Sequence, residues 1–381
     1  MSRALLECQR SLFDIPEGVT YLNCGYQGPQ LRHSTKTAIE QLKRKSQPWT
    51  ITPDDFFSPA ERLREQFAAL IDASPDDIAI VPSISYAMAT AASNLPVGQD
   101  QHTVMLAEQF PSHVYAWREF GHRQARITTV ERPRDNDWTR DIIERIDSDC
   151  AIAALPGAHW TDGYQLRLEE ISQHCQANGT ALVLDLTQSL GAVPFSVRGV
   201  EADFVATSIY KWMLGPPGLC LMYVNPSHQQ GRPIELNWIS RKNSEDFAGL
   251  TDYTNEFQAG ARRFDAGGRA NLVNIGIAGS ALQQIHSWGV ERISAYTKIL
   301  TDLAARMASE RGLEYTPDAY RSPHIIGISL PVHAARKIAD QLHQRQVYVS
   351  LRGNKLRIAP HLYNTSSDIE RLFTVLDEFL R

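Results

Sequence analysis

Residues 202–218 read ADFVATSIYKWMLGPPG, and this stretch decides the fold. The β-prone run 204–207 leads directly to Lys211, a sharp turn is predicted at 214–218, and a second apolar run follows at 219–224. A charged lysine between two buried strands is costly, but a neutral amine with a lowered pKa is tolerated there and can act as a nucleophile. The alternative is an ordinary lysine in an exposed loop. The rest of the chain discriminates between the two.

The composition excludes several classes of protein. The 381 residues are 43% hydrophobic and 21% charged, which is typical of a globular chain with a sizeable core and, at this length, two domains. A net charge of −5 offers no basic surface, so neither nucleic acid nor a membrane is an expected partner. The sequence shows no apolar run of about 20 residues and no signal peptide. We therefore expect a cytoplasmic protein.

The five cysteines are scattered and odd in number, without a C-x-x-C pair, so neither a disulfide framework nor a metal site is predicted. They are Cys8, Cys24, Cys150, Cys175 and Cys220.

Apolar strands alternate with helices through the first two thirds of the chain. This alternation predicts an α/β fold in which a mostly parallel sheet is covered by helices on both faces. Ligands of such sheets bind beyond the carboxyl ends of the strands, so the residues just after each strand are the candidates for function. The predicted strands are 78–82, 103–107, 126–130, 151–155, 181–185, 204–206 and 219–224, and helices are predicted at 34–45, 59–71, 83–94, 112–120, 139–146 and 166–178.

The pattern changes after residue 224. A polar, irregular stretch covers 225–261, and then a smaller α+β C-terminal domain is predicted. Its helices are expected at 271–288, 290–311 and 367–380, with another helix between the strands 324–330 and 347–351, and a last strand at 355–359. The predicted domains are a large cofactor-binding domain at 21–260 and a small domain at 261–381, on which an N-terminal segment, 1–20, packs.

A carboxylate ends the most apolar strand of the protein. Asp185 follows 181–184, where its pKa would rise unless a cation pairs with it. The protonated pyridine nitrogen of pyridoxal 5'-phosphate (PLP) would be such a cation, and Gln188 could bond the ring hydroxyl. The alternative is an aspartate that caps the following turn. Lys211 and Asp185 together favour PLP more than either does alone.

Other residues at strand ends could complete such a site. Ser83, Ser85 and Tyr86 open a helix where backbone N–H groups and hydroxyls suit a phosphate, although a plain serine N-cap is the alternative. Phe110 could stack on a planar ring or belong to the core. His159 could contact a substrate or only pack in a loop.

Two later segments suit anions. Arg357 interrupts an apolar strand, which suits bidentate binding of a substrate carboxylate, with a structural ion pair as the alternative. Gly267 and Gly268 precede a long helix at the domain junction, where the backbone could approach an anion.

In this order the segments resemble the class V aminotransferase family of PLP-dependent enzymes, fold type I, from about residue 21 to residue 365. The family includes cysteine desulfurases, selenocysteine lyases, kynureninases and isopenicillin-N epimerases. The specific matches are DLTQ at 185–188, TSIYK at 207–211, RFDAGG at 263–268 and RIAPHLYNT at 357–365.

The resemblance implies roles for these residues. Lys211 would be the catalytic Schiff-base lysine. The cofactor would be held by Ser85, Tyr86, Phe110, Asp185, Gln188, Ser208, Tyr210, Lys211 and Gly268, and the substrate by Arg357, Asn23 and His159. Family members are usually homodimers with the site between subunits, and a threonine at the position of Gly268 usually reaches the phosphate of the neighbouring subunit.

Departures from the family pattern narrow the activity. Phe110 and Tyr210 stand where desulfurases carry histidine, and 347–357 holds no cysteine, so we reject a cysteine desulfurase. The chain is more similar to kynureninases and isopenicillin-N epimerases, although kynureninases usually carry histidine in place of Gln188.

We expect an enzyme that acts on an amino acid as an aminotransferase or a carbon–sulfur or carbon–carbon lyase. The alternatives are an amino-acid epimerase or racemase and a non-enzymatic binding protein. Further candidates for substrate contact are His113, Trp160 and Arg241.

Overall fold

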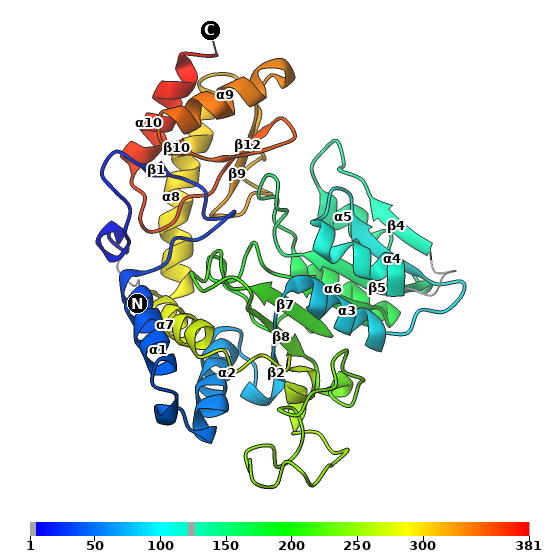
Figure 1. Cartoon of the computed structure of the whole chain (residues 1–381). Helices are drawn as coiled ribbons and strands as arrows, with labels where there is room; N and C mark the ends of the chain where they lie inside the picture. The colour runs from blue at the N-terminus through cyan, green and yellow to red at the C-terminus, as the bar shows by residue number, and fades with distance from the viewer. Residues whose placement is uncertain (1–4, 121–125, 381) are drawn as a thin grey trace.

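A computed structural model describes residues 5–120 and 126–380 of the chain, and Figure 1 shows its architecture. A large sheet with its covering helices forms one part, and a smaller part carries the C-terminal helices. Across these described ranges, no helix has the length and apolar character needed to cross a membrane.

The large sheet has seven strands, and six of them run parallel. Only β8 is antiparallel to its neighbours, β2 and β7. The prediction of a mostly parallel, seven-stranded α/β sheet is confirmed. The strand order is β2 (Ile78–Val81), β8 (Cys220–Val224), β7 (Phe204–Ser208), β6 (Ala181–Asp185), β5 (Cys150–Pro156), β3 (His102–Leu106) and β4 (Arg126–Val130).

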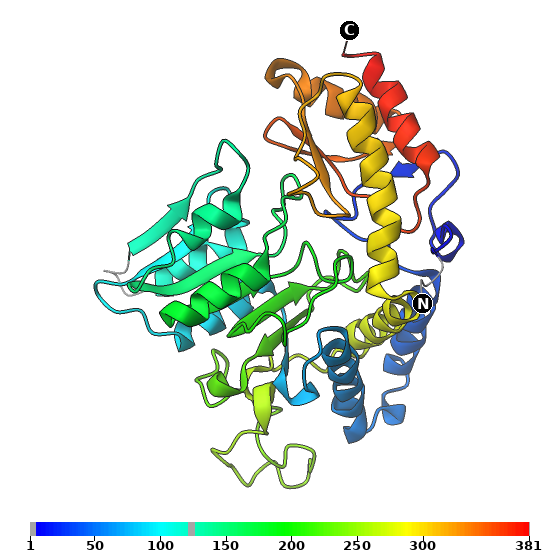
Figure 2. The same cartoon turned by 180° about the vertical axis from the view of Figure 1, so that it is seen from behind.

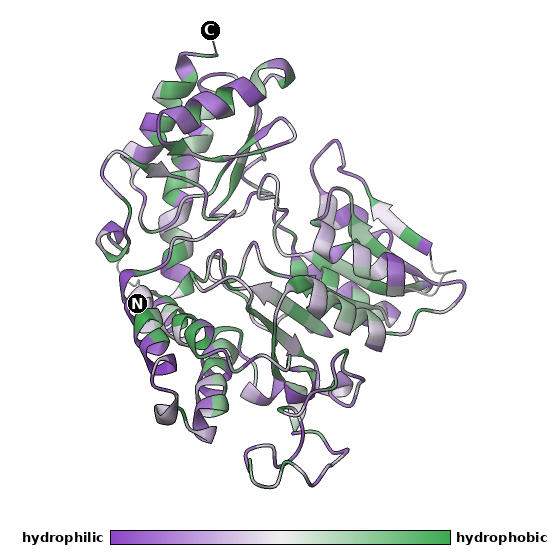
Figure 3. Cartoon of the chain, in the orientation of Figure 1, coloured by the Kyte–Doolittle hydropathy of each residue, from purple (hydrophilic) through white to green (hydrophobic). Residues whose placement is uncertain are grey.

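Both faces of the central strands are buried, which explains why those strands are largely apolar, whereas the edge strand β4 stays partly exposed. Along β6, Leu182 and Leu184 enter one hydrophobic core while Val183 enters the other, as the two-residue period of a strand requires. Figure 3 shows the hydrophobic colour concentrated in the central strands and on the inner sides of the helices. The first core is closed by α2 (Ser58–Leu70), α5 (Trp138–Ile143), α6 (Leu168–Asn178) and α7 (Leu272–Trp288), and the second by α3 (Ile84–Asn94) and α4 (Tyr115–Phe120).

The smaller part is an α+β unit. Three strands, β11 (Ser350–Arg352), β12 (Lys355–Ile358) and β9 (Ile326–Ser329), form an antiparallel sheet in that order. Their apolar side chains share a core with the helices. Figure 2 shows the long α8 leading from α7 into this unit. The helices are α8 (Val290–Ser309), α9 (Val332–Gln344) and α10 (Ser366–Asp377).

The predicted strand 347–351 divides in two. Its first half, β10 (Val347–Tyr348), pairs in parallel with β1 (Thr20–Tyr21), whereas β11 pairs with β12. Pairing to a distant N-terminal segment leaves no local sequence signal, and this explains the difference from the prediction.

The N-terminal segment lies against both parts of the molecule. Gln9 donates its backbone N–H to the Leu362 carbonyl over 2.7 Å, and Phe13 packs with Trp288 and Tyr363. The helix α1 (Arg32–Lys45) packs on α7, which itself belongs to the core of the large sheet. The domain boundaries at residues 20 and 260 stay predictions. Short 3-10 helices lie at η1 (Arg10–Leu12), η2 (Pro48–Thr50), η3 (Pro53–Phe56), η4 (Pro75–Asp77), η5 (Pro111–His113), η6 (Pro226–His228) and η7 (Gly260–Phe264).

Candidate active site

The sheet topology gathers the predicted residues at one edge. Asp185 and Ser208 end the parallel strands β6 and β7, and Phe110 follows β3, so all three reach the carboxyl edge of the sheet. β8 runs the other way, so the turn at Gly218 before it lies at the same edge. A cavity of about 330 Å³ opens there. It is lined by Pro82, Ser83, Ile84, Gln109, Phe110, Ser112, His113, Pro156, Ala158, Trp160, Asp185, Thr187, Gln188, Ser208, Tyr210, Lys211, Gly218 and Leu219.

Lys211 is buried in the lining of this cavity, with only 6% of its surface exposed. Burial lowers the pKa of its amine to about 8, while the Asp185 carboxylate acts in the opposite direction. The Nζ atom lies 5.4 Å from the Phe110 ring centre and 5.5 Å from that of Tyr210. It has no hydrogen-bond partner within the described part of the chain. The structure thus excludes the exposed-loop alternative for this lysine.

The backbone around Lys211 is fixed by close packing. Gly28 donates its N–H to the Tyr210 carbonyl over 3.0 Å, and a Cβ atom at Gly28 would lie 2.1 Å from the Lys211 carbonyl oxygen. Leu214 adopts a positive φ of 55°, a conformation that is unfavourable for leucine and is held by the turn. The position of the amine is therefore set by the whole turn 209–215.

Asp185 presents a carboxylate with spare capacity. Its Oδ1 accepts the Thr187 N–H over 2.9 Å, and the Thr187 hydroxyl oxygen accepts the Ser208 N–H over 3.0 Å, which ties β6 to β7. Within residues 5–120 and 126–380, Oδ2 has no hydrogen-bond or ion-pair partner. His113 is fully buried nearby, and burial lowers its pKa to about 4 against the opposing effect of Asp185. His113 is thus neutral and belongs to the Asp185 side of the cavity.

Gln188 is held in place by its side-chain amide. Its Nε2 donates to the Gly25 carbonyl over 2.9 Å, and its Oε1 accepts the Trp212 indole N–H over 3.0 Å. One N–H of the amide stays available, which is enough for the predicted bond to a ring oxygen.

A second cavity, of about 470 Å³, shares Phe110, Trp160, Gln188, Tyr210 and Lys211 with the first. The remaining residues in its lining are Gly25, Tyr26, Gln27, Pro217, Arg352 and Arg357. Lys211 therefore stands at the junction of two compartments, one with Asp185 and one with Arg357.

Arg357 is 1% exposed, and burial, with a further contribution from Arg352, lowers its pKa to about 9. It donates to the Trp160 carbonyl over 2.7 Å and to the Ser350 hydroxyl over 3.4 Å. The structural ion pair considered as the alternative is absent among the described residues, since no carboxylate lies within ion-pair distance of this guanidinium. Its buried Nε has no partner there either.

Two predicted substrate contacts lie behind the cavity and not in it. The Asn23 Oδ1 accepts the Ser350 hydroxyl over 2.7 Å, so Asn23 supports Arg357 through Ser350. His159 is buried against Trp138 and bonds Thr161, which argues against a contact between His159 and substrate. The neighbouring Trp160 lines both cavities instead.

Three further candidates also lie outside the two cavities. Ser85 and Tyr86 follow Ser83, and it is Ser83 that reaches the cavity and caps α3 by accepting the Tyr86 N–H. Ser85 contacts the Ser83 hydroxyl over 2.9 Å. Arg241 stacks on Phe257 and bonds the Asn255 carbonyl, away from the cavity linings.

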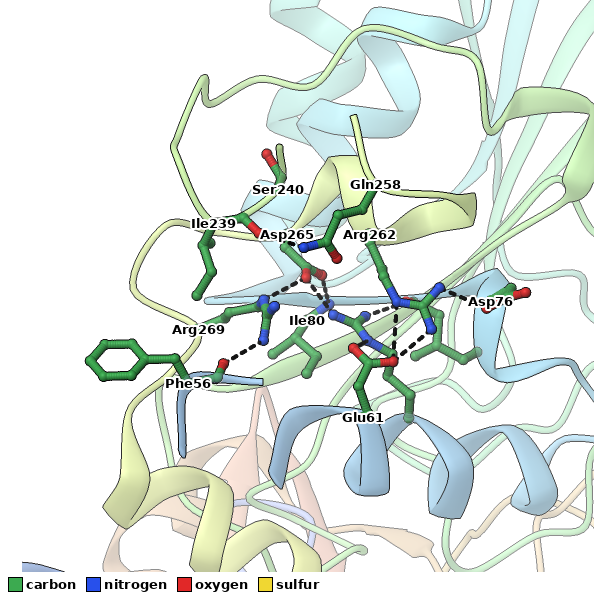
Figure 4. Close-up of polar contacts among 12 residues, drawn as sticks. Phe56, Glu61, Asp76, Ile80, Ile239, Ser240, Gln258, Arg262, Asp265 and Arg269 are labelled. Atoms are coloured by element: carbon green, nitrogen blue, oxygen red, sulfur yellow. Dashed lines mark hydrogen bonds and ion pairs between the residues drawn. The ribbon is translucent and has the colours of Figure 1, made fainter. Parts of the chain in front are cut away.

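A buried ionic network holds the loop that contains Gly268 (Figure 4). Asp265 accepts hydrogen bonds from the Ile80 N–H and Arg64, and pairs with Arg269 over 2.7 Å. The Arg269 guanidinium thus points into the protein. In the described chain the Gly268 N–H has no acceptor, and a Cβ atom added there meets nothing within 4 Å.

The residues present fit an aldehyde cofactor with a cationic ring and a phosphate. Judged by the described residues, Lys211 supplies an unpartnered amine, Asp185 an unpartnered carboxylate oxygen, and Phe110 an aromatic face. The 11-residue helix α3 begins at the cavity, and the N–H groups of Ile84 and Ser85 have no acceptors in the part of the chain that the structure describes.

Sequence reasoning identified Ser83 but missed two other residues of the site. Thr187 and Arg352 line the cavities, and Thr187 also fixes Ser208. The signal for Thr187 was present, since it lies between Asp185 and Gln188 in the quoted motif. Arg352 alternates with Ser350 on the strand beside Arg357, and that spacing could have found it.

Comparison with protein families gives one match over most of the chain. The family model described as "Aminotransferase class-V" matches residues 54–372. The protein named "Uncharacterized aminotransferase YcbU" of Bacillus subtilis is 28% identical over 311 residues, which cover 81% of this chain and 80% of that protein. The kynureninase of Shouchella clausii is 25% identical and covers 96% of this chain and 90% of that protein.

Solved structures show the same fold. A cysteine desulfurase from Thermococcus onnurineus matches with a TM-score of 0.84 at 16% identity, covering 99% of both chains. The cystine C–S lyase C-DES in complex with cysteine persulfide matches with a TM-score of 0.86 at 18% identity, covering 95% of this chain and 98% of that chain. A C-DES variant with glycine covalently linked to its PLP cofactor has a TM-score of 0.87 at 18% identity, over 97% of this chain and 99% of that chain.

Proposed function

The chain belongs to the class V aminotransferase family of PLP-dependent enzymes, and we propose that it acts on an amino acid as an aminotransferase or as a carbon–sulfur or carbon–carbon lyase. In this proposal Lys211 is the residue that binds the cofactor aldehyde. One observation carries it: the Lys211 amine stands between the compartment of Asp185 and the compartment of Arg357.

Each residue contributes a definite step. Arg357 binds the substrate carboxylate with the N–H groups that no described residue engages, which places Cα beside the Lys211 amine. Bound PLP supplies an electron sink that acidifies the Cα–H bond. With its pKa lowered to about 8, Lys211 exists partly as a neutral amine near neutral pH and can take and return the Cα proton.

The surrounding residues orient and shield this chemistry. Asp185 keeps a proton on the ring nitrogen, and Thr187 fixes the carboxylate for that purpose. Phe110 and Trp160 pack edge to face at 5.6 Å over the shared part of the two cavities and exclude water from the reacting atoms. Ser83, Ser208 and the start of α3 supply donors for a phosphate.

The environment of Cys24 argues against a cysteine desulfurase. Cys24 is the cysteine that faces the Lys211 backbone, and its Sγ donates to the Lys211 carbonyl oxygen. It is fully buried, and burial raises its pKa to about 12, so it is not a nucleophile at neutral pH.

The spectrum of the purified protein tests the cofactor assignment. The wild type should show the absorbance band of lysine-bound PLP, and Lys211→Ala should lose it. The matched control is Lys337→Ala on the exposed side of α9, which should keep the band. A band that persists in Lys211→Ala would refute the proposed role.

Product analysis in deuterium oxide distinguishes the reaction types. A keto acid is expected from transfer or elimination, and a shorter amino acid from a lyase that returns protons to the cleaved substrate. Deuterium at Cα of a substrate whose side chain stays intact, with no keto acid and no cleaved product, would instead identify an epimerase or racemase and would refute the leading proposal.

We also infer a homodimer in which the Gly268 N–H of one subunit reaches the cofactor phosphate of the other. Two observations support this inference: this N–H lacks an acceptor in the described protomer, and Gly268 lies outside the linings of the two cavities that share Lys211.

A further inference from the structure

We propose that the substrate carries a second anionic group on its side chain, such as a carboxylate, and that Arg352 binds it. This inference rests on the proposed function, because it places the α-carboxylate on Arg357. It adds a substrate class, acidic amino acids, that neither the family nor the relatives' names specify.

The hairpin of β11 and β12 places both arginines on one face. Ser350 pairs with Arg357 and Arg352 pairs with Lys355, so these four side chains share a face. Leu351 and Leu356 pair on the opposite face, in the core of the smaller unit. Arg352 and Arg357 are diagonal neighbours, with Cα atoms about 7–8 Å apart in a typical ladder. Two ends of one small molecule can therefore reach both.

The four side chains differ in whether a partner residue balances their charge or accepts their hydrogen bonds. Lys355 is neutralised by Asp162, and Ser350 bonds Asn23. Neither arginine has a carboxylate within ion-pair distance anywhere in residues 5–120 and 126–380. Arg352 bonds only the Leu351 carbonyl, and its buried Nε has no partner there.

The second cavity, of about 470 Å³, suits a negatively charged ligand. Lys211, Arg352 and Arg357 all line it, and none of its lining residues is acidic. Guanidinium groups keep their charge in proteins, so the two arginines repel each other unless anions arrive. A single α-carboxylate would neutralise one of them and leave the other uncompensated in a half-buried position.

The Arg352 guanidinium lies 5.3 Å from the Trp160 ring centre. This contact orients the arginine and covers one of its faces, but it does not supply a counter-charge. Trp160 also accepts a hydrogen bond from Arg357 through its carbonyl oxygen. One residue thus holds both arginines, which fixes the separation that a doubly charged substrate must match.

Calorimetric titration of the holoenzyme with unreactive acids tests the proposal without turnover. Glutarate should bind at least about 10-fold more tightly than butyrate, since only glutarate can engage both arginines. Arg352→Gln should weaken glutarate binding about 10- to 100-fold and leave butyrate binding within about threefold. Arg352→Lys should keep part of the preference. The matched control, Arg336→Gln on the exposed face of α9, should behave as wild type.

The same comparison applies to substrates. L-glutamate or L-aspartate should perturb the cofactor band at lower concentration than the corresponding amides. Equal binding of glutarate and butyrate by the wild type would overturn the proposal, even if no Arg352 variant folds. An Arg352→Gln variant that keeps the preference for glutarate over butyrate would also overturn it. Failure of the proposed function looks different, because the band of lysine-bound PLP would itself be missing.

Discussion

At the scale of single residues, Lys211 combines a buried position with a titratable charge. Its pKa falls from an ordinary value of 10.5 to about 8 because burial disfavours the ammonium. Between these two values the unfolded chain binds a proton that the folded protein does not, so the stability of the cofactor-free protein rises with pH. Below pH 8 both states are protonated, and the folded state carries the full cost of the buried charge.

Lys211→Met should therefore stabilise the cofactor-free protein at pH 7, by on the order of 3 kcal/mol from about 1.4 kcal/mol for each tenfold change in proton affinity. The gain should shrink as the pH rises from 8 toward 10.5. Urea unfolding of both proteins at pH 7 and pH 9.5 measures it. Lys337→Met on the surface should show no such dependence, and a gain for Lys211→Met that is equal at both pH values would contradict the lowered pKa.

The sequence predicted well those residues whose chemistry is incompatible with their surroundings. A lysine, an aspartate and an arginine in or at the ends of apolar strands have few alternatives to a functional role, and Lys211, Asp185 and Arg357 all lie at the cavities. It predicted poorly the residues where the direction of the side chain decides. Asn23 and His159 stand one step behind the cavity, and nothing local in the sequence distinguishes a lining residue from its support.

At the scale of elements, the loop 265–269 depends on a buried ion network that also anchors β2 and α2. Asp265 is fully buried and accepts from Arg64, Arg269 and the Ile80 N–H. Asp265→Asn removes the carboxylate that Arg64 and Arg269 share. Arg64 keeps its pairing with Glu61, but Arg269 then has no carboxylate within ion-pair distance among the described residues. Because an unpaired buried charge is expensive, we expect a loss of about 3–5 kcal/mol in the free energy of unfolding.

The matched control for this change is Asp76→Asn at the rim of the same network. Asp76 pairs with Arg262 over 2.7 Å, but its side chain is 63% exposed, so the expected cost is about 0–1 kcal/mol. Urea unfolding of the two variants beside the wild type gives both values. Equal losses in the free energy of unfolding would show that the buried ion pairs stabilise the fold no more than the exposed pair does.

Elements were predictable where the signal is local, and not where pairing is distant. The apolar strands of the large sheet and the helices between them follow from periodicity, as does the start of α7 at its cap Asn271. The strand order does not follow from it. Likewise, β10 separates from β11 because the N-terminal β1 pairs with it, and β1 itself is too short to predict.

At the scale of the whole molecule, the proposed site draws on both parts of the described protomer. The sheet edge supplies Asp185, Ser208 and Lys211, and the smaller unit supplies Arg352 and Arg357, so the two parts must stay docked for the two cavities to share Lys211. The N-terminal segment strengthens that docking, because Gln9 bonds Leu362 of the smaller part and accepts a hydrogen bond from Trp288 of α7. The proposal adds the Gly268 N–H as a further donor to the phosphate at the neighbouring subunit's site.

Subunit complementation tests whether Gly268 acts across a dimer. Gly268→Glu should weaken cofactor binding by repelling the phosphate, and the protomer itself should tolerate the change because nothing lies within 4 Å of the new Cβ. Lys211→Ala should lose the band of lysine-bound PLP independently. In a mixed dimer of these two variants, one site holds both changes and the other holds neither, provided that Gly268 serves the partner's site.

Co-refolding the two variants in equal amounts should therefore restore the band at about a quarter of all sites, because half of the randomly assembled dimers are mixed and each has one intact site. The band should follow the fraction that sediments at twice 42.7 kDa. The matched control mixes Lys211→Ala with Asp185→Asn, two changes in the lining of one cavity of a single protomer, and its band should not exceed the band that the Asp185→Asn subunits show by themselves, because mixing creates no site without a change. No recovery in the first mixture, with mixed dimers present, would place the Gly268 contact within its own subunit or remove it from the site.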